Sequence, residues 1–349
     1  MSEALPQGAV IGILGGGQLG RMLSVAASRL GYRTHIYEPG AAPAGDVAHQ
    51  VTQASYDDAD ALRRFAESVD VITYEFENVP AASLDLLESI RPIRPNRRAL
   101  AVSQDRLTEK EFLRGLGLRT APFANVETEA DLPAALAEIG TPSILKTRRM
   151  GYDGKGQIRF RDPAQRDWTG AASVLEGFVA FSGEISVIVA RGADGAVAAY
   201  DPGLNLHEGG ILRTTTVPCG LAQKPVTDAV LLAAQIVNAL DYVGVMGVEL
   251  FVTPDGLVVN EIAPRVHNSG HWTQAGCAVD QFEQHIRAVA GLPLGDGRRH
   301  ADVIMENLIG DDMDRVPELL GTADVQIHLY GKEETRAGRK MGHVNRICR

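Results

Sequence analysis

The first hundred residues alternate between expected strands and expected helices, and this alternation limits the fold more than any other sequence feature. Apolar runs predict buried strands at 9–14, 34–38 and 70–74. Apolar residues at helical spacing predict intervening helices at 19–30, 59–69 and 80–90. Alternation of this kind predicts a parallel sheet with helices on both faces.

A glycine-rich turn joins the first strand to the first helix. Gly15, Gly17 and Gly20 satisfy the spacing G-x-G-x-x-G, and Glu38 ends the next strand. Such glycines let a phosphate approach the backbone, and the helix N-terminus attracts its charge. Alone, the loop fits an NAD-dependent oxidoreductase, a site for some other phosphate, or a tight turn without a ligand.

The rest of the chain predicts further α+β structure. Prolines near 91–96 break the alternation, and 97–115 is expected to be a helical linker. A small α+β unit over 121–189 contains a predicted strand at 143–147 and a strand pair near 174–179. Turn signals at 192–195 and 254–256 predict hairpins, and a long helix is expected between them at 226–240.

Length and composition indicate a globular protein of several domains. A chain of 349 residues exceeds one ordinary core. We place the domains at 1–103, 104–185 and 186–349. Hydrophobic residues make up 45%, but no apolar run reaches the roughly 18 residues of a membrane helix.

Net charge and cysteine content narrow the classes of function and the cellular compartments that fit this chain. The net charge of −10 disfavours broad nucleic-acid binding, although a local basic pocket for a small anion is compatible with it. The N-terminal residues have no secretory pattern, and three scattered cysteines fit a reducing compartment. We therefore expect a cytoplasmic protein that binds neither membrane nor nucleic acid.

A second glycine-rich loop follows the strand at 143–147. Lys146 lies near the end of that strand, and residues 148–157 carry three cations and Asp153 among their glycines. Such a loop can fold over a polyphosphate, exclude water and bring charge to a transferring phosphoryl group. It lacks the Walker pattern, because no G-K-[ST] opens a helix. The alternative is a solvated basic hairpin.

Two glutamates flank the turn at 254–256. A three-residue loop there would place Glu249 directly opposite Glu261. Facing Cβ atoms lie about 5 Å apart, where like charges are destabilising. Mg²⁺ would relieve that repulsion, and Asn260 could add a carbonyl oxygen. The alternative is a register shifted by one residue, with one glutamate facing solvent.

Together these segments resemble the ATP-grasp superfamily and, within it, the 5-(carboxyamino)imidazole ribonucleotide synthases. The resemblance covers nearly the whole chain, and its blocks are 15–20, 73–78, 104–106, 151–157, 264–273, 332 and 336–343. The blocks 264–273 and 336–343 are the specific ones, because other ATP-grasp enzymes lack them. Met150 departs from the pattern, which has glycine there, and we expect it to stiffen the lid hinge.

The resemblance implies an α/β ATP-grasp architecture. Its parts would be an N-terminal Rossmann-like parallel sheet, a small α+β lid and a C-terminal α+β domain. The implied activity is ATP- and bicarbonate-dependent carboxylation of 5-aminoimidazole ribonucleotide through carboxyphosphate, in purine synthesis. It implies Mg²⁺, with ATP and bicarbonate as co-substrates, and neither NAD nor biotin. It also implies a homodimer whose product passes to a mutase of the same pathway.

The resemblance also implies roles for individual residues. Arg106 and Lys146 would contact the ATP phosphates, Glu249 and Glu261 would hold Mg²⁺, and Glu184 would bind the ribose. The other nucleotide-binding residues would be Gly151, Tyr152, Asp153, Gly154, Lys155, Gly156, Gln157, Glu176, Gly177, Phe178, Val179, His207 and Asn260. Catalytic roles fall to Asp153, Lys155 and His267.

The ribonucleotide would occupy the other side of the cleft. Its implied contacts are Gly17, Gln18, Leu19, Glu75, Asn78, Tyr152, Asp153, Arg265, Asn268, Ser269, His271, Lys332, Arg339 and Lys340. The alternative for His267, Asn268 and His271 is core residues with satisfied partners. For the basic C-terminal run the alternative is a solvated tail.

Three rival functions differ in what they leave unexplained. An NAD-dependent oxidoreductase would leave the second glycine loop and the carboxylate pair without a role. A different ATP-grasp ligase, such as a transformylase or a biotin carboxylase, would not need residues 267–273 and 336–343. A non-catalytic nucleotide-binding protein would not need Lys146, Glu249 and Glu261 together.

Overall fold

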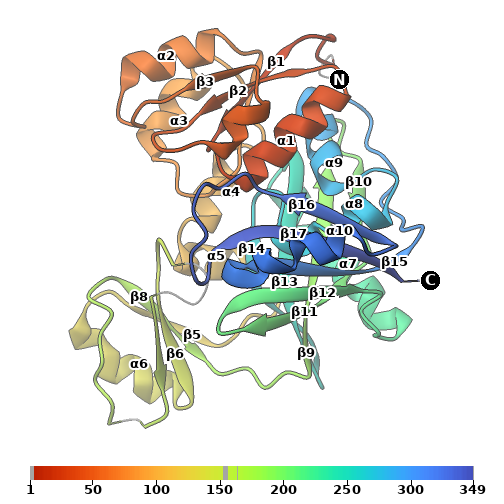
Figure 1. Cartoon of the computed structure of the whole chain (residues 1–349). Coiled ribbons are helices and arrows are strands. Elements are labelled where there is room, and N and C mark those ends of the chain that lie inside the picture. The colour runs from red at the N-terminus through yellow and green to blue at the C-terminus, as the bar shows by residue number, and fades with distance from the viewer. Residues whose placement is uncertain (1–3, 152–155, 163, 349) are drawn as a thin grey trace.

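The computed structural model describes residues 4–151, 156–162 and 164–348, and its strands form three sheets (Figure 1). Over the described residues, the N-terminal sheet has four strands in the order β3-β2-β1-β4, and every pairing is parallel. The strands are β1 (Val10–Leu14), β2 (Arg33–Tyr37), β3 (Gln50–Thr52) and β4 (Val71–Tyr74). The predicted parallel sheet is therefore confirmed, whereas β3 is an addition to it.

Helices cover both faces of this sheet because side chains alternate along its strands. Ile11 and Ile13 of β1 pack in one core cluster with helix α1, and Leu14 packs in another with helices α2 and α3. The first cluster also contains Trp272 and Phe282, so the N-terminal and C-terminal parts share a core. The helices are α1 (Gln18–Arg29), α2 (Ala59–Glu67) and α3 (Ala81–Glu88), with a 3-10 turn at Pro43–Val47.

The linker predicted to be helical at 97–115 is helical, and it is divided into two helices, α4 (Arg97–Ser103) and α5 (Arg106–Gly115). Asp105 ends the continuity because its carboxylate accepts hydrogen bonds from the N–H groups of Leu107 and Thr108 and so caps α5. This cap fixes where α5 begins, and with it the position of Arg106.

The lid is a small antiparallel sheet in the order β5-β8-β6-β7, and it projects from the rest of the molecule (Figure 1). Its elements are β5 (Phe123–Val126), a 3-10 turn (Glu129–Asp131), α6 (Leu132–Ile139), β6 (Ser143–Thr147), β7 (Gln157–Phe160) and β8 (Ser173–Gly177). The predicted strand at 143–147 is confirmed. The predicted strand pair near 174–179 is wrong, because β8 is one strand lying between β5 and β6.

The C-terminal part is built on a large antiparallel sheet, nine-stranded over the described residues, in the order β14-β13-β9-β11-β12-β15-β17-β16 with β10 beside β9. Its strands are β9 (Gly183–Arg191), β10 (Val197–Ala199), β11 (Gly203–Glu208), β12 (Ile211–Val217), β13 (Gly244–Thr253), β14 (Gly256–Ala263), β15 (Asp302–Ile309), β16 (Val325–Leu329) and β17 (Lys340–Cys348).

Two helices cover opposite faces of this sheet. Val187 and Val189 of β9 pack with α7 (Gln223–Ala239), and the intervening Ile188 packs with α9 (Gln281–Ala290). The remaining helical elements are 3-10 turns at Asn268–Gly270 and Gly310–Arg315, α8 (Thr273–Gly276) and α10 (Val316–Leu320). Among the described helices, none combines the length and the apolar character needed to cross a bilayer.

Candidate functional site

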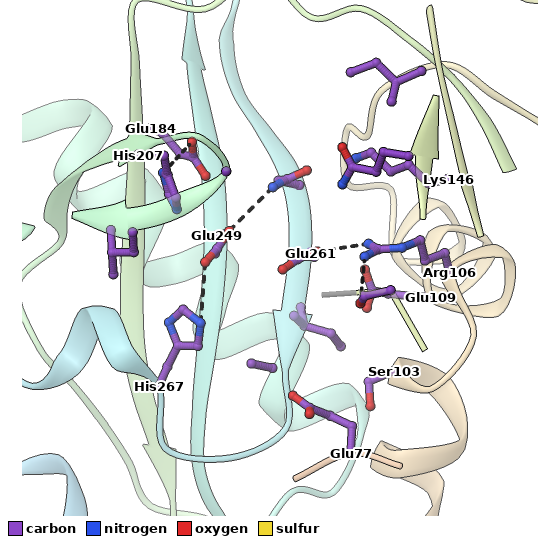
Figure 2. A pocket seen from close by; sticks show the side chains of 18 of the residues that line it. Glu77, Ser103, Arg106, Glu109, Lys146, Glu184, His207, Glu249, Glu261 and His267 are labelled. Carbon is purple, nitrogen blue, oxygen red and sulfur yellow. Dashed lines mark hydrogen bonds and ion pairs between the residues drawn. The ribbon is translucent and has the colours of Figure 1, made fainter. Parts of the chain in front are cut away.

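A cavity of about 980 Å³ lies where the three parts of the molecule meet. Its walls come from the end of β4, the start of α5, strands β6 and β7 of the lid, and strands β9, β11, β13 and β14. Figure 2 shows Glu184, Glu249 and His267 on the C-terminal sheet side and Arg106, Glu109 and Lys146 on the linker and lid side. The volume suits a ligand of nucleotide size.

The two glutamates predicted to face each other do so: Glu249 on β13 pairs with Glu261 on β14. The turn, however, is shorter than the predicted three-residue loop: Thr253 pairs with Gly256, so the turn has two central residues. This turn alone would not place Glu249 opposite Glu261, but a bulge at Asn260 shifts the register by one residue and brings the two glutamates opposite each other. In a bulge two residues oppose one, so Asn260 and Glu261 both lie against Glu249, and the Asn260 Nδ2 lies 3.5 Å from Glu249 Oε2.

The pKa values of the two carboxyl groups are shifted in opposite directions. Burial, together with the charges of Glu261 and Glu184, raises the pKa of Glu249 well above its ordinary value. Burial would also raise the pKa of Glu261, but Arg106, whose Nη1 lies 2.9 Å from Glu261 Oε2, opposes it. Together with the charges of Lys146 and Lys110, Arg106 lowers the pKa of Glu261. A divalent cation between them would let both ionise.

Mg²⁺ fits this pair on the chemistry of its donors. Glu249, Glu261 and the Asn260 carbonyl offer hard oxygen ligands, and Mg²⁺ takes one or two carboxylates with phosphate oxygens and water. Among the described residues, no group of three or more His, Cys, Asp or Glu side chains forms a self-sufficient metal site. The carboxylates of Glu249 and Glu261 leave the other coordination positions of such a cation to phosphate oxygens and water.

Cations and carboxylates alternate on the linker and lid side. Lys146 Nζ donates to Glu176 Oε2 at 2.9 Å, and Lys110 Nζ lies 3.2 Å from the other Glu176 oxygen. Glu109 also lines the cavity, and burial followed by the charge of Glu261 raises its pKa. The sequence reasoning missed Glu109 and Lys110. Their spacing of three and four residues from Arg106, which places all three on one helix face, is the signal that could have found them.

Aromatic side chains and one further carboxylate also line the cavity. Phe178 is 57% exposed there, and the rings of Phe181 and Phe251 stack with centroids 4.5 Å apart. Glu184 Oε2 lies 3.2 Å from His207 Nδ1. Exposed aromatic surface in a concave site indicates a place for a flat apolar ligand group.

His267 lies beside Glu249, and each of its ring nitrogens faces a polar side chain. Its Nδ1 lies 2.8 Å from Ser269 Oγ, and its Nε2 lies 3.5 Å from Glu249 Oε1. A Cβ on Gly247 would approach the Cβ of His267 to 2.7 Å, so that position requires glycine. Burial, followed by the charge of Arg265, lowers the pKa of His267 well below its ordinary value.

Two neighbouring polar side chains of the lining have fixed partners. Asn268 and the buried Asn307 exchange side-chain hydrogen bonds at 2.9 and 2.8 Å. The Nη2 of Arg265 lies 2.7 Å from Glu77 Oε1. Asn307 and Glu77 were not predicted, since each is defined by a partner distant in sequence.

The first glycine loop is filled by the protein's own carboxylates. The N–H groups of Gly17 and Gly20 donate to Glu75 Oε1 and Oε2 at 2.7 and 2.9 Å, and the N–H of Gly16 donates to Glu38 Oε2 at 2.9 Å. A Cβ on Gly17 would lie 2.6 Å from Glu75 Oε1. The glycines thus admit a glutamate, and a phosphate would have to displace it.

Most of the residues predicted for the site line this cavity. They are Gln18, Leu19, Glu75, Asn78, Arg106, Lys146, Gly151, Gln157, Phe178, Glu184, His207, Glu249, Asn260, Glu261, Arg265, His267, Asn268 and Lys340. Tyr152, Asp153, Gly154 and Lys155 lie outside the described residues.

Other predicted residues lie behind the lining or beside it, and they are Gly17, Gly156, Glu176, Gly177, Val179, Ser269, His271, Lys332 and Arg339. His271 is buried, and its Nδ1 lies 2.9 Å from Gln281 Nε2, a placement that favours the alternative of a core histidine. Lys332 Nζ donates to the carbonyl of Lys340, and Arg339 donates to the carbonyl of Glu334. Of these basic residues, only Lys340 lines the cavity directly.

A parallel-sheet domain, a glycine-loop lid and a carboxylate-bearing antiparallel sheet around one cavity define an ATP-grasp protein. The comparisons agree: the ATP-grasp domain matches residues 111–282, and the ribonucleotide synthetase preATP-grasp domain matches residues 9–104. The phosphoribosylaminoimidazole carboxylase C-terminal domain matches residues 303–349. The chain belongs to the N5-carboxyaminoimidazole ribonucleotide synthase family.

Individual relatives support this membership. The chain is 53% identical to the N5-carboxyaminoimidazole ribonucleotide synthase of Brucella melitensis, over 99% of this chain and 98% of the relative. It resembles a solved ADP complex of an N5-carboxyaminoimidazole ribonucleotide synthetase with a TM-score of 0.96 and 40% identity, over 100% and 94% of the two chains. The Aspergillus clavatus synthase with ADP and 5-aminoimidazole ribonucleotide gives a TM-score of 0.90 and 30% identity, over 98% and 94%.

Proposed function

We propose that the chain catalyses the ATP-dependent formation of N5-carboxyaminoimidazole ribonucleotide from 5-aminoimidazole ribonucleotide in purine biosynthesis. The observation that carries the proposal is the facing pair Glu249 and Glu261, set beside Arg106 and Lys146 in a cavity under the lid. Family membership supports it, as does the relative with ADP and the ribonucleotide bound together.

ATP would lie along the cavity from the aromatic side chains to the carboxylate pair. The adenine contacts the hinge at Phe178, and the ribose hydroxyls donate to Glu184, which His207 orients. Arg106, Lys146 and the lid bind the phosphates. Glu249, Glu261 and Asn260 would hold Mg²⁺, which when bound would supply positive charge to the transferring phosphoryl group.

The ribonucleotide would bind on the opposite wall. Gln18, Leu19, Glu75 and Asn78 lie at the carboxyl ends of the parallel strands, where open α/β sheets bind ligands. Lys340 contacts the monophosphate. Lys332 supports it through the Lys340 carbonyl, and Arg339 adds positive potential.

In the reaction, the terminal phosphoryl group of ATP passes to bicarbonate and gives carboxyphosphate and ADP. Arg106 and Lys146 stabilise the charge on that group. Under the closed lid, which excludes water, carboxyphosphate releases CO₂ and the exocyclic amine attacks it. The amine proton passes to Asp153 or to the departing phosphate, while Lys155 brings charge from the lid. His267 orients the anionic reactants beside Glu249.

The proposal extends to the cellular setting. The protein acts as a cytoplasmic homodimer that uses neither NAD nor biotin, and its product passes to a mutase of the same pathway. Scattered cysteines, of which Cys219 and Cys277 are buried and unpaired, support a reducing compartment.

The test measures ADP release with Mg-ATP and bicarbonate, with and without 5-aminoimidazole ribonucleotide. We expect release that requires the ribonucleotide. Glu249→Gln should lose about 100-fold or more in turnover, because a carboxylate ligand of Mg²⁺ is lost and with it positive charge beside the transferring phosphoryl group. The exposed Glu208→Gln serves as the matched control and should retain full turnover. Release indifferent to the ribonucleotide, or none at all, would contradict the proposal.

A further inference from the structure

Lys110 is a buried cation with no place in the nucleotide contacts described above. It lies on α5, its side chain is 2% exposed, and it does not line the cavity. A buried ammonium group is costly unless it is paired. Its counter-ion is Glu176 of the lid strand β8, whose Oε1 lies 3.2 Å from Lys110 Nζ and whose side chain is 5% exposed.

Glu176 is shared between two lysines that differ in their surroundings. Lys146 lies on the neighbouring strand β6, diagonally across the pairing of Ile144 with Glu176, and donates to the second carboxylate oxygen at 2.9 Å. Lys146 is 12% exposed and lines the cavity. Lys146 is therefore within reach of a ligand in the cavity, whereas Lys110 is not.

This arrangement creates a charge problem when a polyphosphate enters. The phosphates attract Lys146 away from Glu176, which would leave a buried carboxylate without its hydrogen-bonded cation. Losing one partner of a buried ion pair is strongly unfavourable. Lys110 Nζ lies 3.2 Å from Glu176 Oε1, so a cation remains beside this carboxylate when Lys146 leaves.

We propose that Lys110 is a positioning residue, the permanent counter-ion of Glu176 that allows Lys146 to transfer from Glu176 to the nucleotide phosphates. The inference rests on the proposed function, since it requires ATP in the cavity. Lys110 does not touch the nucleotide; it sets how strongly Glu176 competes with the phosphates for Lys146. The ion pair also joins α5 to the lid, so this exchange takes place where the lid meets the linker.

The experiment is a set of charge variants whose dissociation constants for Mg-ATP are measured at pH 8 by calorimetry without bicarbonate. In Lys110→Met, Glu176 depends on Lys146 alone and retains it, so we expect affinity to fall about tenfold. Adding Glu176→Gln to Lys110→Met removes the competitor and should raise affinity above that of Lys110→Met. Lys110→Arg keeps the charge and should bind more tightly than Lys110→Met.

A control separates this role from general stability. Lys224→Met removes an exposed lysine of α7, whose side chain is 85% exposed, and should leave affinity unchanged. Melting curves establish that each variant is folded. Native affinity in a folded Lys110→Met protein, or a double variant that binds more weakly than Lys110→Met, would overturn the inference. Absence of Mg-ATP binding by the native chain would instead overturn the proposed function itself.

Discussion

At the N-terminus of α1, the carboxylate of Glu75 lies where a dinucleotide-binding loop would hold a phosphate. This loop and a dinucleotide-binding loop share the glycine spacing that lets an anionic group approach the backbone closely. What differs is a glutamate that arrives from the end of β4, 58 residues away from Gly17. The motif therefore predicted the strand, turn and helix but not the occupant of the turn.

Replacing Glu75 with alanine should show how much its carboxylate stabilises the glycine turn. The N–H groups of Gly17 and Gly20 lose their acceptor, and we expect a loss of about 2 kcal/mol in the free energy of unfolding, typical of hydrogen bonds to a charged group. Millimolar inorganic phosphate should recover part of the loss, because a helix N-terminus attracts anions. Urea unfolding measures both effects. The exposed Glu67→Ala is the control, and an equal, small loss in both variants would contradict this expectation.

Met150 shows a second constraint at the residue scale. The family resemblance has glycine there, and the structure gives the reason: Met150 has a φ of 60°, in the left-handed region that glycine adopts without cost. A side chain in that region costs about 1 kcal/mol or more. The methionine is 69% exposed at the base of the lid, so backbone strain rather than crowding distinguishes it.

At the scale of elements, the start of α5 joins the linker to the lid. Asp105 caps α5 and also accepts from Arg148, with 2.8 Å between Asp105 Oδ2 and Arg148 Nη2. The N–H of Arg106 donates to the carbonyl of Arg148. One buried carboxylate therefore fixes both where the helix begins and where the lid loop leaves its strand.

A matched pair of capping variants tests this. Asp105→Ala should cost about 2 kcal/mol in unfolding free energy, because the cap is lost together with the hydrogen-bonded ion pair to the half-buried Arg148, which keeps Glu127 as a partner. Asp58→Ala removes the cap of α2, where the side chain accepts from Ala61, and should cost about 1 kcal/mol. Chemical denaturation of both proteins gives the comparison. Similar costs would mean that the Arg148 contact contributes nothing measurable.

The sequence predicted an element well where the residue pattern within that one segment was sufficient to define it. Strand β6 was predicted at its observed bounds, and the facing of Glu249 and Glu261 was correct. The bulge at Asn260 was not foreseen, because a bulge depends on the pairing of two strands. Strand β3 has three residues, too few for a pattern. Lys110 and Asn307 were missed because partners distant in sequence bury them.

At the scale of the whole molecule, His285 of α9 links two sheets. Its Nδ1 accepts from the N–H of Val245 on β13, so its Nε2 carries the proton and donates to Thr73 Oγ1 on β4 at 2.8 Å. Burial lowers the pKa of His285 to about 3. The neutral ring is thus part of the contact between the N-terminal and C-terminal parts.

This linkage predicts acid sensitivity of definite sign. The unfolded chain takes up a proton at His285 near its ordinary pKa of about 6.5, and the folded chain does so only near 3, so stability falls as pH falls between these values. The His285 contribution is about 2 kcal/mol between pH 6.5 and 5. His285→Asn should be less stable at pH 7.5 but decline less steeply in urea unfolding. The exposed His300→Asn should decline like the native chain, and equal slopes in all three would refute the assignment.

The division of the hydrophobic cores has a consequence for motion during turnover. Helices α1 and α9 share one core, whereas the lid has its own, built from residues 126–175. The lid can pivot as a rigid body without breaking the apolar contacts that unite the other two parts. We therefore expect the distance from the end of β4 to the Glu249–Glu261 pair to stay constant when the lid moves. On the proposed function, this frame would set the geometry between the ribonucleotide and Mg²⁺, and the lid strand that carries Lys146 would move against it.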